Sequence, residues 1–500
     1  MKQLVYWFKQ FLQLANSRNG KIVLFLVLFY FTFVLRAHNY ERTPTAGFID
    51  EMNYAWPGIY LIETGVPVSW SSLEYPERAK VFSGVISYYG ADPKVGVNLY
   101  SPWLDQPPLF SLLVGYFAHY FHADRSQYIP SSFIRFPLIF IAALTSLLIF
   151  WIGKKTSGFW TGMLGMLFYG TIPLFVFASR LAMAENLIAF LFCCIVALLI
   201  KFEEKRTIVY LCIIPLLIGV AGLSKAPGFL LTIFFAFYSF MLLSKKKKFT
   251  NSLLKVIGLC LIVLPFIGGF FWYGLHYDPA IFWRLMEIQS NRPVGFSSLG
   301  WFFVSPSYGT QYFIESWYIF CLLSFGYFLI QGVEKKKQIV LYACAFWILV
   351  VMVSGGAGDM LAWYRFGAFP FLALIGAWGM QIVYERANFF GLFLSVGMLL
   401  GNRHLLVNPF RPDITPMGYR LITGGLLLPG FLAAIFEDKR WILVIRIIIV
   451  GVFVLGLWFN IIYIYNAFEV ACENLTCPLV PGTWLSELHF PFIWRFLVLN

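Results

Sequence analysis

Apolar stretches long enough to cross a membrane recur along this chain of 500 residues, from Lys21 to Asn466. A hydrocarbon core about 30 Å thick needs about 20 residues of helix, and the helix satisfies its own backbone polar groups in lipid. Only 12% of the residues are charged, whereas a soluble globular domain carries about 25%. We therefore expect an all-α polytopic membrane protein with about 13 transmembrane helices.

Positive charges between the apolar stretches predict the orientation of these helices. The formal net charge of +13 is spread over short clusters, such as residues 245–248 and 335–337, and does not form one basic patch. Basic clusters of this kind mark cytoplasmic loops. The charge therefore indicates a membrane protein and gives no reason to expect a nucleic acid partner.

The placement of basic clusters in cytoplasmic loops also predicts which segments of the chain lie outside the membrane. Within the first outer loop, residues 107–121 are apolar but too short to span, so we expect a helix on the membrane surface. The outer tail holds Cys472 and Cys477, which could form a local disulfide in an oxidising compartment. The predicted parts are an interfacial helix (1–20), a transmembrane domain (21–464) with outer loops at 38–133 and 276–316, and an outer tail (465–500).

An adjacent pair of carboxylates, Asp50 and Glu51, follows the first predicted span. Carboxylates near hydrocarbon are unfavourable unless they are solvated, paired or chemically employed, so the pair is a candidate functional site. The alternative is that both residues cap a short interfacial helix, because acidic side chains favour the first helical turn.

Other polar side chains fall at the ends of predicted spans on the same outer side. Lys225 lies in a turn with the sequence Gly-Leu-Ser-Lys-Ala-Pro-Gly, residues 222–228. Each such residue alone could snorkel to the surface or cap a helix. Together they provide cations for a phosphate and a carboxylate for a proton. The further candidates are Asp105, Gln106, Arg180, Glu185, Arg284, Gln289, Arg292, Tyr364 and Arg365.

These motifs, in their order along the chain, resemble the GT-C superfamily of integral-membrane glycosyltransferases. The resemblance rests on Asp50-Glu51, on Asp105-Gln106-Pro107-Pro108, on the Lys225 turn and on Arg365 before a proline-containing span. The most similar branch contains protein O-mannosyltransferases and the bacterial aminoarabinose lipid A transferase. Aminoarabinose transferases show Glu-Lys-Pro-Pro at the second motif, so the departure here leaves the sugar and the acceptor open.

The resemblance implies a GT-C type fold with a long first extracytoplasmic loop that carries surface helices, in a prokaryotic plasma membrane. It implies inverting transfer of a hexosyl or pentosyl group from a polyisoprenyl-phosphate donor to a lipid, glycan or protein acceptor at the outer face. The expected catalytic residues are Asp50, as the base, and Glu51. The expected donor-phosphate ligands are Lys225, Arg292, Arg284 and Arg365. The expected acceptor or supporting residues are Asp105, Gln106, Arg180, Glu185, Gln289 and Tyr364.

This chemistry needs no cofactor, because the phosphate leaves as an anion that cations can stabilise without a proton donor. A divalent metal is possible but not indicated, and Asp105 with His276 is the pair that could hold one.

Two other classes of membrane protein stay open. A lipid-linked oligosaccharide ligase or polymerase should have its catalytic loop late in the chain, with Arg and His dominant, whereas here the longest outer loop comes first and leads with carboxylates. A lipid-linked sugar transporter or flippase should carry ionisable residues near the middle of spans. Arg446 is such a residue, but nearly all the other candidates lie at span ends.

Overall fold

The computed structural model describes the chain with several gaps, and all structural statements concern the described part. Three expectations lie wholly or partly outside it: the interfacial helix over residues 1–20, of which 1–15 are not described, the basic cluster 245–248 and the Cys472–Cys477 disulfide. The described residues are 16–44, 49–88, 91–244, 249–292, 294–295, 302, 315–354, 362–400, 415–436, 439–472 and 482–486.

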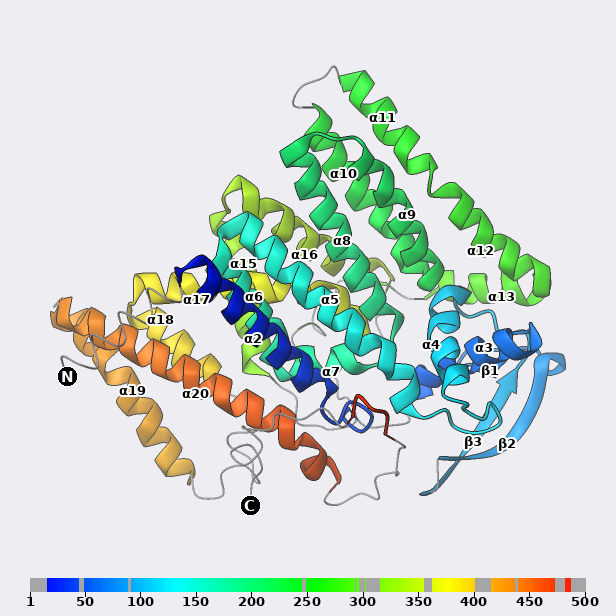
Figure 1. Cartoon of the computed structure of the whole chain (residues 1–500), viewed down its shortest axis with the longest axis horizontal. Coiled ribbons are helices and arrows are strands. Elements are labelled where there is room, and N and C mark those ends of the chain that lie inside the picture. The colour runs from blue at the N-terminus through cyan, green and yellow to red at the C-terminus, as the bar shows by residue number, and fades with distance from the viewer. Residues whose placement is uncertain are drawn as a thin grey trace.

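Helices dominate the architecture, as the apolar stretches predict (Figure 1). Those of the first half are α2 (Arg18–Ala37), α3 (Ile49–Thr64), α4 (Pro108–Tyr120), α5 (Ser131–Ser157), α6 (Phe159–Thr171), α7 (Pro173–Arg180), α8 (Ala184–Lys205), α9 (Val209–Ser224) and α10 (Leu231–Ser244). Those of the second half are α11 (Phe249–Leu261), α12 (Leu264–Tyr277), α13 (Pro279–Ser290), α15 (Ser316–Gln331), α16 (Lys335–Ser354), α17 (Phe369–Arg386), α18 (Phe389–Leu394), α19 (Pro416–Phe436) and α20 (Lys439–Cys472).

Every predicted span coincides with a helix, but the predicted number of spans is not confirmed. Among the described residues, nine helices are long and apolar enough to cross a membrane, and a tenth span results if the bent pair α6–α7, with 68° between its halves, counts as one. The remaining three are shorter apolar helices, Val209–Ser224, Ser316–Gln331 and Phe389–Leu399. The protein is thus a multi-pass integral membrane protein, whose described part contains 9 or 10 spans by length and composition.

The predicted first outer loop contains a small sheet that the sequence analysis did not anticipate. Helix α4 coincides with the segment 107–121 that was expected as a helix, and α3 precedes it. Between them in sequence lie β1 (Ser69–Trp70), β2 (Lys80–Tyr88) and β3 (Ala91–Tyr100), in the antiparallel order β1-β3-β2. Along β3, Val97 and Leu99 are buried while Asn98 between them is less so. This alternation is typical of a half-buried strand. Residues 69–100, expected only as part of the first outer loop, therefore contain a sheet within an otherwise helical fold.

Helices α3 and α4 pack closely because glycines face each other where they cross. A Cβ on Gly58 would come within 1.8 Å of the Ser111 carbonyl oxygen, and a Cβ on Gly115 within 2.2 Å of the Gly58 backbone. Figure 1 shows both helices beside the sheet at one corner of the molecule. This close contact fixes the segment that begins with Asp50.

Arginine side chains, one buried (Arg180) and one half-buried (Arg446), hold the ends of helices together. Arg180 donates to the carbonyl oxygens of Leu35, Arg36 and Thr43, which lie at the end of α2 and just beyond it. Arg446, the charged residue inside a predicted span, donates to the Glu385 carbonyl oxygen at 3.1 Å near the end of α17. Such contacts satisfy the carbonyl groups that a helix leaves without partners at its C-terminus. Arg446 therefore needs no transport role to account for it.

Candidate active site

The carboxylate pair lies in the first turn of α3, where acidic side chains are favourable. Glu51 is fully buried and makes two hydrogen bonds with Arg135 of α5, from Nε to Oε1 at 2.8 Å and from Nη2 to Oε2 at 2.6 Å. Its Oε1 also accepts the Ala182 backbone N–H at 2.7 Å. Both oxygens of Glu51 are thus engaged in joining α3 to α5 and to the turn before α8.

Asp50, by contrast, is only half-buried. Burial is the main cause that raises the pKa of Asp50 to about 6, with Glu185 and Glu51 also raising it and Lys225 lowering it. The charges of Lys225 and Glu185 therefore act directly on this carboxylate, although Lys225 is 175 residues away in sequence. A carboxylate with a pKa near neutrality can exchange a proton under ordinary conditions.

Lys225 lies in the extended turn between α9 and the short 3-10 helix Ala226–Leu230. The turn is tight enough to require glycine, because a Cβ on Gly228 would come within 2.3 Å of the Ala221 carbonyl oxygen. The Gly228 N–H donates to the Lys225 carbonyl oxygen at 2.8 Å and closes the turn. The glycine in this motif therefore shapes the backbone that carries Lys225.

The Lys225 ammonium group already has protein partners. Its Nζ donates to Glu185 Oε1 at 2.5 Å, and both side chains are buried. The same Nζ lies 4.9 Å from the centre of the Tyr364 ring. Sequence-predicted Lys225, Glu185 and Tyr364 thus meet in one cluster with Asp50, although they come from four separate parts of the chain.

Tyr54 of this cluster, and Asn53 beside it on α3, were missed in the sequence. Tyr54 is buried, which raises the pKa of its hydroxyl group, and that group interacts with Lys225, which lowers the pKa. Asn53 Oδ1 and Glu185 Oε2 are buried polar atoms that make no hydrogen bond within the described chain. Such atoms indicate a position for water or a ligand. Residues three and four positions after Asp50 share its helical face, so the spacing could have identified both Asn53 and Tyr54.

A second cluster surrounds Asp105. Its carboxylate accepts hydrogen bonds from the Ser71 hydroxyl at 2.5 Å and the Tyr75 hydroxyl at 2.7 Å, and its carbonyl oxygen accepts from Gln289 at 2.8 Å. Burial raises the pKa of Asp105 to about 6, while these hydroxyl groups and the charge of Arg292 lower it. The structure thus brings together Asp105, Gln289 and Arg292, as the sequence suggested.

The two clusters are connected by apolar packing. Leu104, next to Asp105, lies in the same small hydrophobic cluster as Leu223 and Phe229, which flank the Lys225 turn. Movement of one cluster would therefore disturb the other.

The remaining candidates contact backbone carbonyl groups, Glu74 or an aromatic ring. Arg180 is buried on backbone carbonyl groups, and exposed Arg284 lies 3.4 Å from Glu74. Arg365 is buried over the Tyr318 ring and lies 3.4 Å from the Phe302 carbonyl oxygen. Gln106 is half-buried next to Asp105.

No group of three His, Cys, Asp or Glu side chains suited to a metal occurs in the described ranges. His276, the residue proposed to join Asp105, is exposed and stacks on Trp272 with 5.3 Å between ring centres. That the reaction requires no cofactor is still a prediction.

Residues 105–272 match the protein family described as dolichyl-phosphate-mannose-protein mannosyltransferase. The crystal structure of ArnT from Cupriavidus metallidurans bound to undecaprenyl phosphate is similar with a TM-score of 0.50 and 13% identity, over 90% of this chain and 78% of that chain. The archaeal oligosaccharyltransferase AglB from Archaeoglobus fulgidus, in complex with an inhibitory peptide and a dolichol-phosphate, gives a TM-score of 0.45 and 12% identity. The match covers 95% of this chain and 61% of that chain. No curated protein sequence matches the chain.

The fold and the matched segment agree with the expectation drawn from the motifs, since the segment contains both the Asp105 motif and the Lys225 turn. The chain thus has a fold similar to that of ArnT, its residues 105–272 match a mannosyltransferase family, and it resembles the branch of protein O-mannosyltransferases and ArnT.

Proposed function

We propose that the chain transfers a sugar from a polyprenyl-phosphate donor to a hydroxyl or phosphate acceptor at the extracytoplasmic face, with inversion at the anomeric carbon. The matched family is named for a dolichyl-phosphate sugar, and the ArnT structure contains undecaprenyl phosphate. Both names describe a sugar carrier made of an isoprenoid and a phosphate, which is why we assign this class of donor.

One observation carries the proposal: Asp50 is electrostatically coupled to the Lys225–Glu185 pair. The reaction needs a group that accepts the acceptor's proton and a cation that stabilises the departing phosphate. Asp50 and Lys225 provide these two functions within one cluster. In the proposed step, the acceptor oxygen attacks the anomeric carbon, its proton passes to Asp50, and the electrons of the breaking C–O bond go to the phosphate.

The neighbouring carboxylates differ in role under this proposal. Glu51 is a positioning residue, because both of its oxygens bind Arg135 or the Ala182 N–H. Asp50 is the catalytic residue, because it is less buried and its pKa of about 6 lets it accept a proton near neutral pH.

Additional phosphate contacts are assigned to Arg292, which lies within electrostatic reach of Asp105. Arg284 is exposed and weakly paired with Glu74, so it is free to reorient toward an anion. We propose no such role for Arg365, whose buried guanidinium lies over the Tyr318 ring.

The decisive experiment compares Asp50→Asn with the unmodified protein, purified and supplied with polyprenyl-phosphate mannose or aminoarabinose and a lipid acceptor. A general base contributes about 10²- to 10⁴-fold in rate, so turnover should fall by at least about 100-fold. Binding of undecaprenyl phosphate, measured separately by tryptophan fluorescence, should change little. Because the sugar is open, the donor set should include further polyprenyl-phosphate hexoses and pentoses.

Glu63→Gln is the matched control, because Glu63 lies on the same helix and pairs at the surface with Arg125. It should keep normal turnover. Near-normal turnover in Asp50→Asn would exclude Asp50 as the base, and a glycosyl product that retains the donor's anomeric configuration would contradict inversion.

A further inference from the structure

A basic pocket lies between the first turns of α2 and the last turns of α5, at the ends of these helices that are remote from Asp50. Along α5, 19 residues separate Arg135, which binds Glu51, from Lys154 at the pocket. At 1.5 Å per residue this is about 28 Å, close to the thickness of a bilayer's hydrocarbon core. The pocket is therefore at the opposite membrane surface from the carboxylate pair.

The pocket has a volume of about 400 Å³, within the range of small-molecule sites. It is lined by Arg18, Lys21, Ile22, Phe25, Phe150, Lys154 and Phe159. All of these residues come from α2, α5 and the start of α6. The lining thus has two parts, a set of cations and an apolar surface.

A row of phenylalanine rings forms the apolar surface. Phe25 and Phe150 have ring centres 4.5 Å apart, and Phe150 and Phe159 have ring centres 5.6 Å apart. Ile22, half-exposed on α2, extends this surface along the helix. A half-buried row of apolar side chains on transmembrane helices is a favourable surface for an acyl chain.

The cations are arranged at one end of this row. Lys21 Nζ lies 5.6 Å from the centre of the Phe159 ring, and Lys154 Nζ lies 5.9 Å from the centre of the Phe150 ring. The lining residues include Arg18 as a third cation and no carboxylate. Three positive charges without a balancing acid indicate an anionic ligand.

Lys155, next to Lys154 in the chain, lies outside the pocket, so the cluster of cations is confined to one side of α5. Lys155 pairs with Glu204 of α8 at 2.9 Å and is not part of the pocket. The next residue along the chain, with the same charge and at the same membrane surface, is thus already neutralised.

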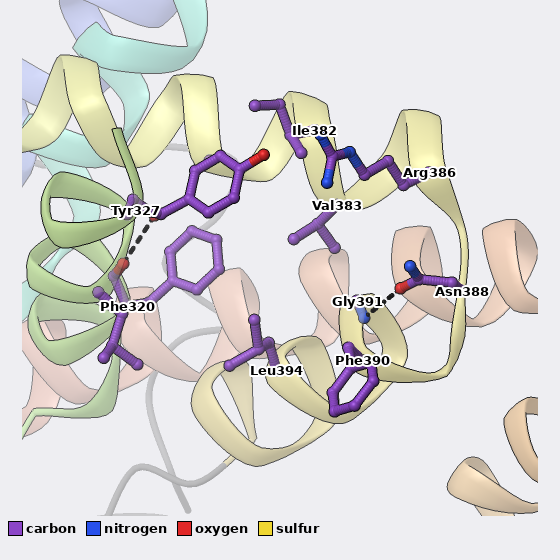
Figure 2. A pocket seen from close by; sticks show the side chains of 12 residues that line it. Phe320, Tyr327, Ile382, Val383, Arg386, Asn388, Phe390, Gly391 and Leu394 are labelled. Atoms are coloured by element: carbon purple, nitrogen blue, oxygen red, sulfur yellow. Dashed lines mark hydrogen bonds between the residues drawn. The ribbon is translucent and has the colours of Figure 1, made fainter. Parts of the chain in front are cut away.

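A second cavity lacks these features. It has about 240 Å³ between α15, α17 and α18, and Figure 2 shows Phe320 and Tyr327 facing Ile382, Val383 and Arg386 across it. Arg386 is its one cation and lies 5.6 Å from the centre of the Tyr327 ring. This cavity has the apolar surface without the cluster of charges, so it does not select an anion strongly.

We propose that the pocket of Arg18, Lys21 and Lys154 binds an anionic glycerophospholipid of the cytoplasmic leaflet. Its headgroup phosphate lies among the three cations, and one acyl chain lies along Phe25, Phe150 and Ile22. Basic pockets between transmembrane helices on the cytoplasmic side are suited to lipid headgroups of this charge. The site is separate from the proposed transfer reaction and does not depend on it.

The test uses the full-length purified protein in nanodiscs of phosphatidylcholine with increasing phosphatidylglycerol, and counts retained phosphatidylglycerol by native mass spectrometry. Each lysine near an anionic lipid contributes about fivefold in affinity. Lys21→Gln/Lys154→Gln should therefore bind phosphatidylglycerol about 25-fold more weakly. Melting of the variant in phosphatidylcholine alone should match that of the unmodified protein, which excludes misfolding as the cause.

Lys155→Gln is the matched control and should retain phosphatidylglycerol fully. The proposal is overturned if Lys155→Gln weakens retention as much as Lys154→Gln, since this would indicate a diffuse surface charge. It is also overturned if phosphatidylcholine is retained equally, or if millimolar inorganic phosphate displaces the lipid, since the pocket would then bind a free anion.

Discussion

Glu51→Gln should destabilise the protein strongly, whereas Asp50→Asn should not. Glu51 and Arg135 are fully buried and share two hydrogen bonds. Removing one partner of a buried ion pair leaves the other charge uncompensated, which lowers the free energy of unfolding by about 3–5 kcal/mol. Glutamine keeps an oxygen that can accept the Ala182 N–H, so we expect the lower end, about 3 kcal/mol.

Heating the purified variants and following the folded fraction by size-exclusion chromatography measures this loss. A change of about 3 kcal/mol should lower the midpoint of melting by roughly 5 °C in a chain of this size. Glu63→Gln provides the control on the same helix, because its pair with Arg125 is partly exposed and contributes at most about 1 kcal/mol. Asp50→Asn should melt within about one degree of the unmodified protein.

A double variant separates the ion pair from other effects. Arg135 also donates to the Tyr40 and Pro44 carbonyl oxygens, so Arg135→Met has a loss of its own. Glu51→Gln/Arg135→Met should lose less stability than the sum of the single variants, by about 1–3 kcal/mol. If Glu51→Gln melts normally and loses turnover while Asp50→Asn stays active, the roles of the two carboxylates are reversed.

Three further predictions follow from the cluster. Burial raises the pKa of Asp50 to about 6, so kcat/KM should decrease tenfold per pH unit below about pH 6, because the protonated base is inactive. Glu185→Gln removes a carboxylate that also raises the pKa of Asp50, so this acidic limb of the pH profile should move to lower pH, and an unchanged limb would refute the coupling. Lys225→Gln should lose both stability and binding of undecaprenyl phosphate, since Glu185 stays buried without its partner. The double variant Lys225→Gln/Glu185→Gln should recover the melting midpoint but not the binding, and recovery of both would remove Lys225 from the site. Gly228→Ala should lower the free energy of unfolding by about 1–3 kcal/mol and weaken donor binding, because the new Cβ meets the Ala221 carbonyl group. Melting and donor titration measure the two effects, and normal binding would show that the turn tolerates a shift.

The sequence predicted the class of fold because its signal is local. Each transmembrane helix is a continuous apolar run, so every predicted span coincides with a helix, and α4 coincides with the helix expected over residues 107–121. The three-stranded sheet was missed because its strands are short segments among polar residues, and pairing of β3 with β1 and β2 depends on residues distant in sequence.

The candidate site was predictable in its members but not in their partners. Lys225, Glu185 and Tyr364 were each identified from their positions at span ends, but nothing in the spacing showed that Glu185 neutralises Lys225. The same holds for Arg135, which lies 84 residues from Glu51 and has no motif of its own. Such pairs are fixed by helix packing, and a single sequence contains no direct record of it.

The charge balance of the cluster bears on how a donor phosphate could bind. Lys225 contributes one positive charge, and Glu185 and ionised Asp50 contribute two negative charges, so the cluster as described is not cationic. A phosphate approaching this cluster would meet net repulsion unless another cation accompanies it or Glu185 gives up its partner. Arg292 is placed to act as that cation, because its charge reaches Asp105 and the Asp105 loop packs against the Lys225 turn through Leu104 and Leu223. Binding of the donor should therefore bring the Asp105 and Lys225 clusters together, with the phosphate shared between Arg292 and Lys225 while Asp50 faces the acceptor.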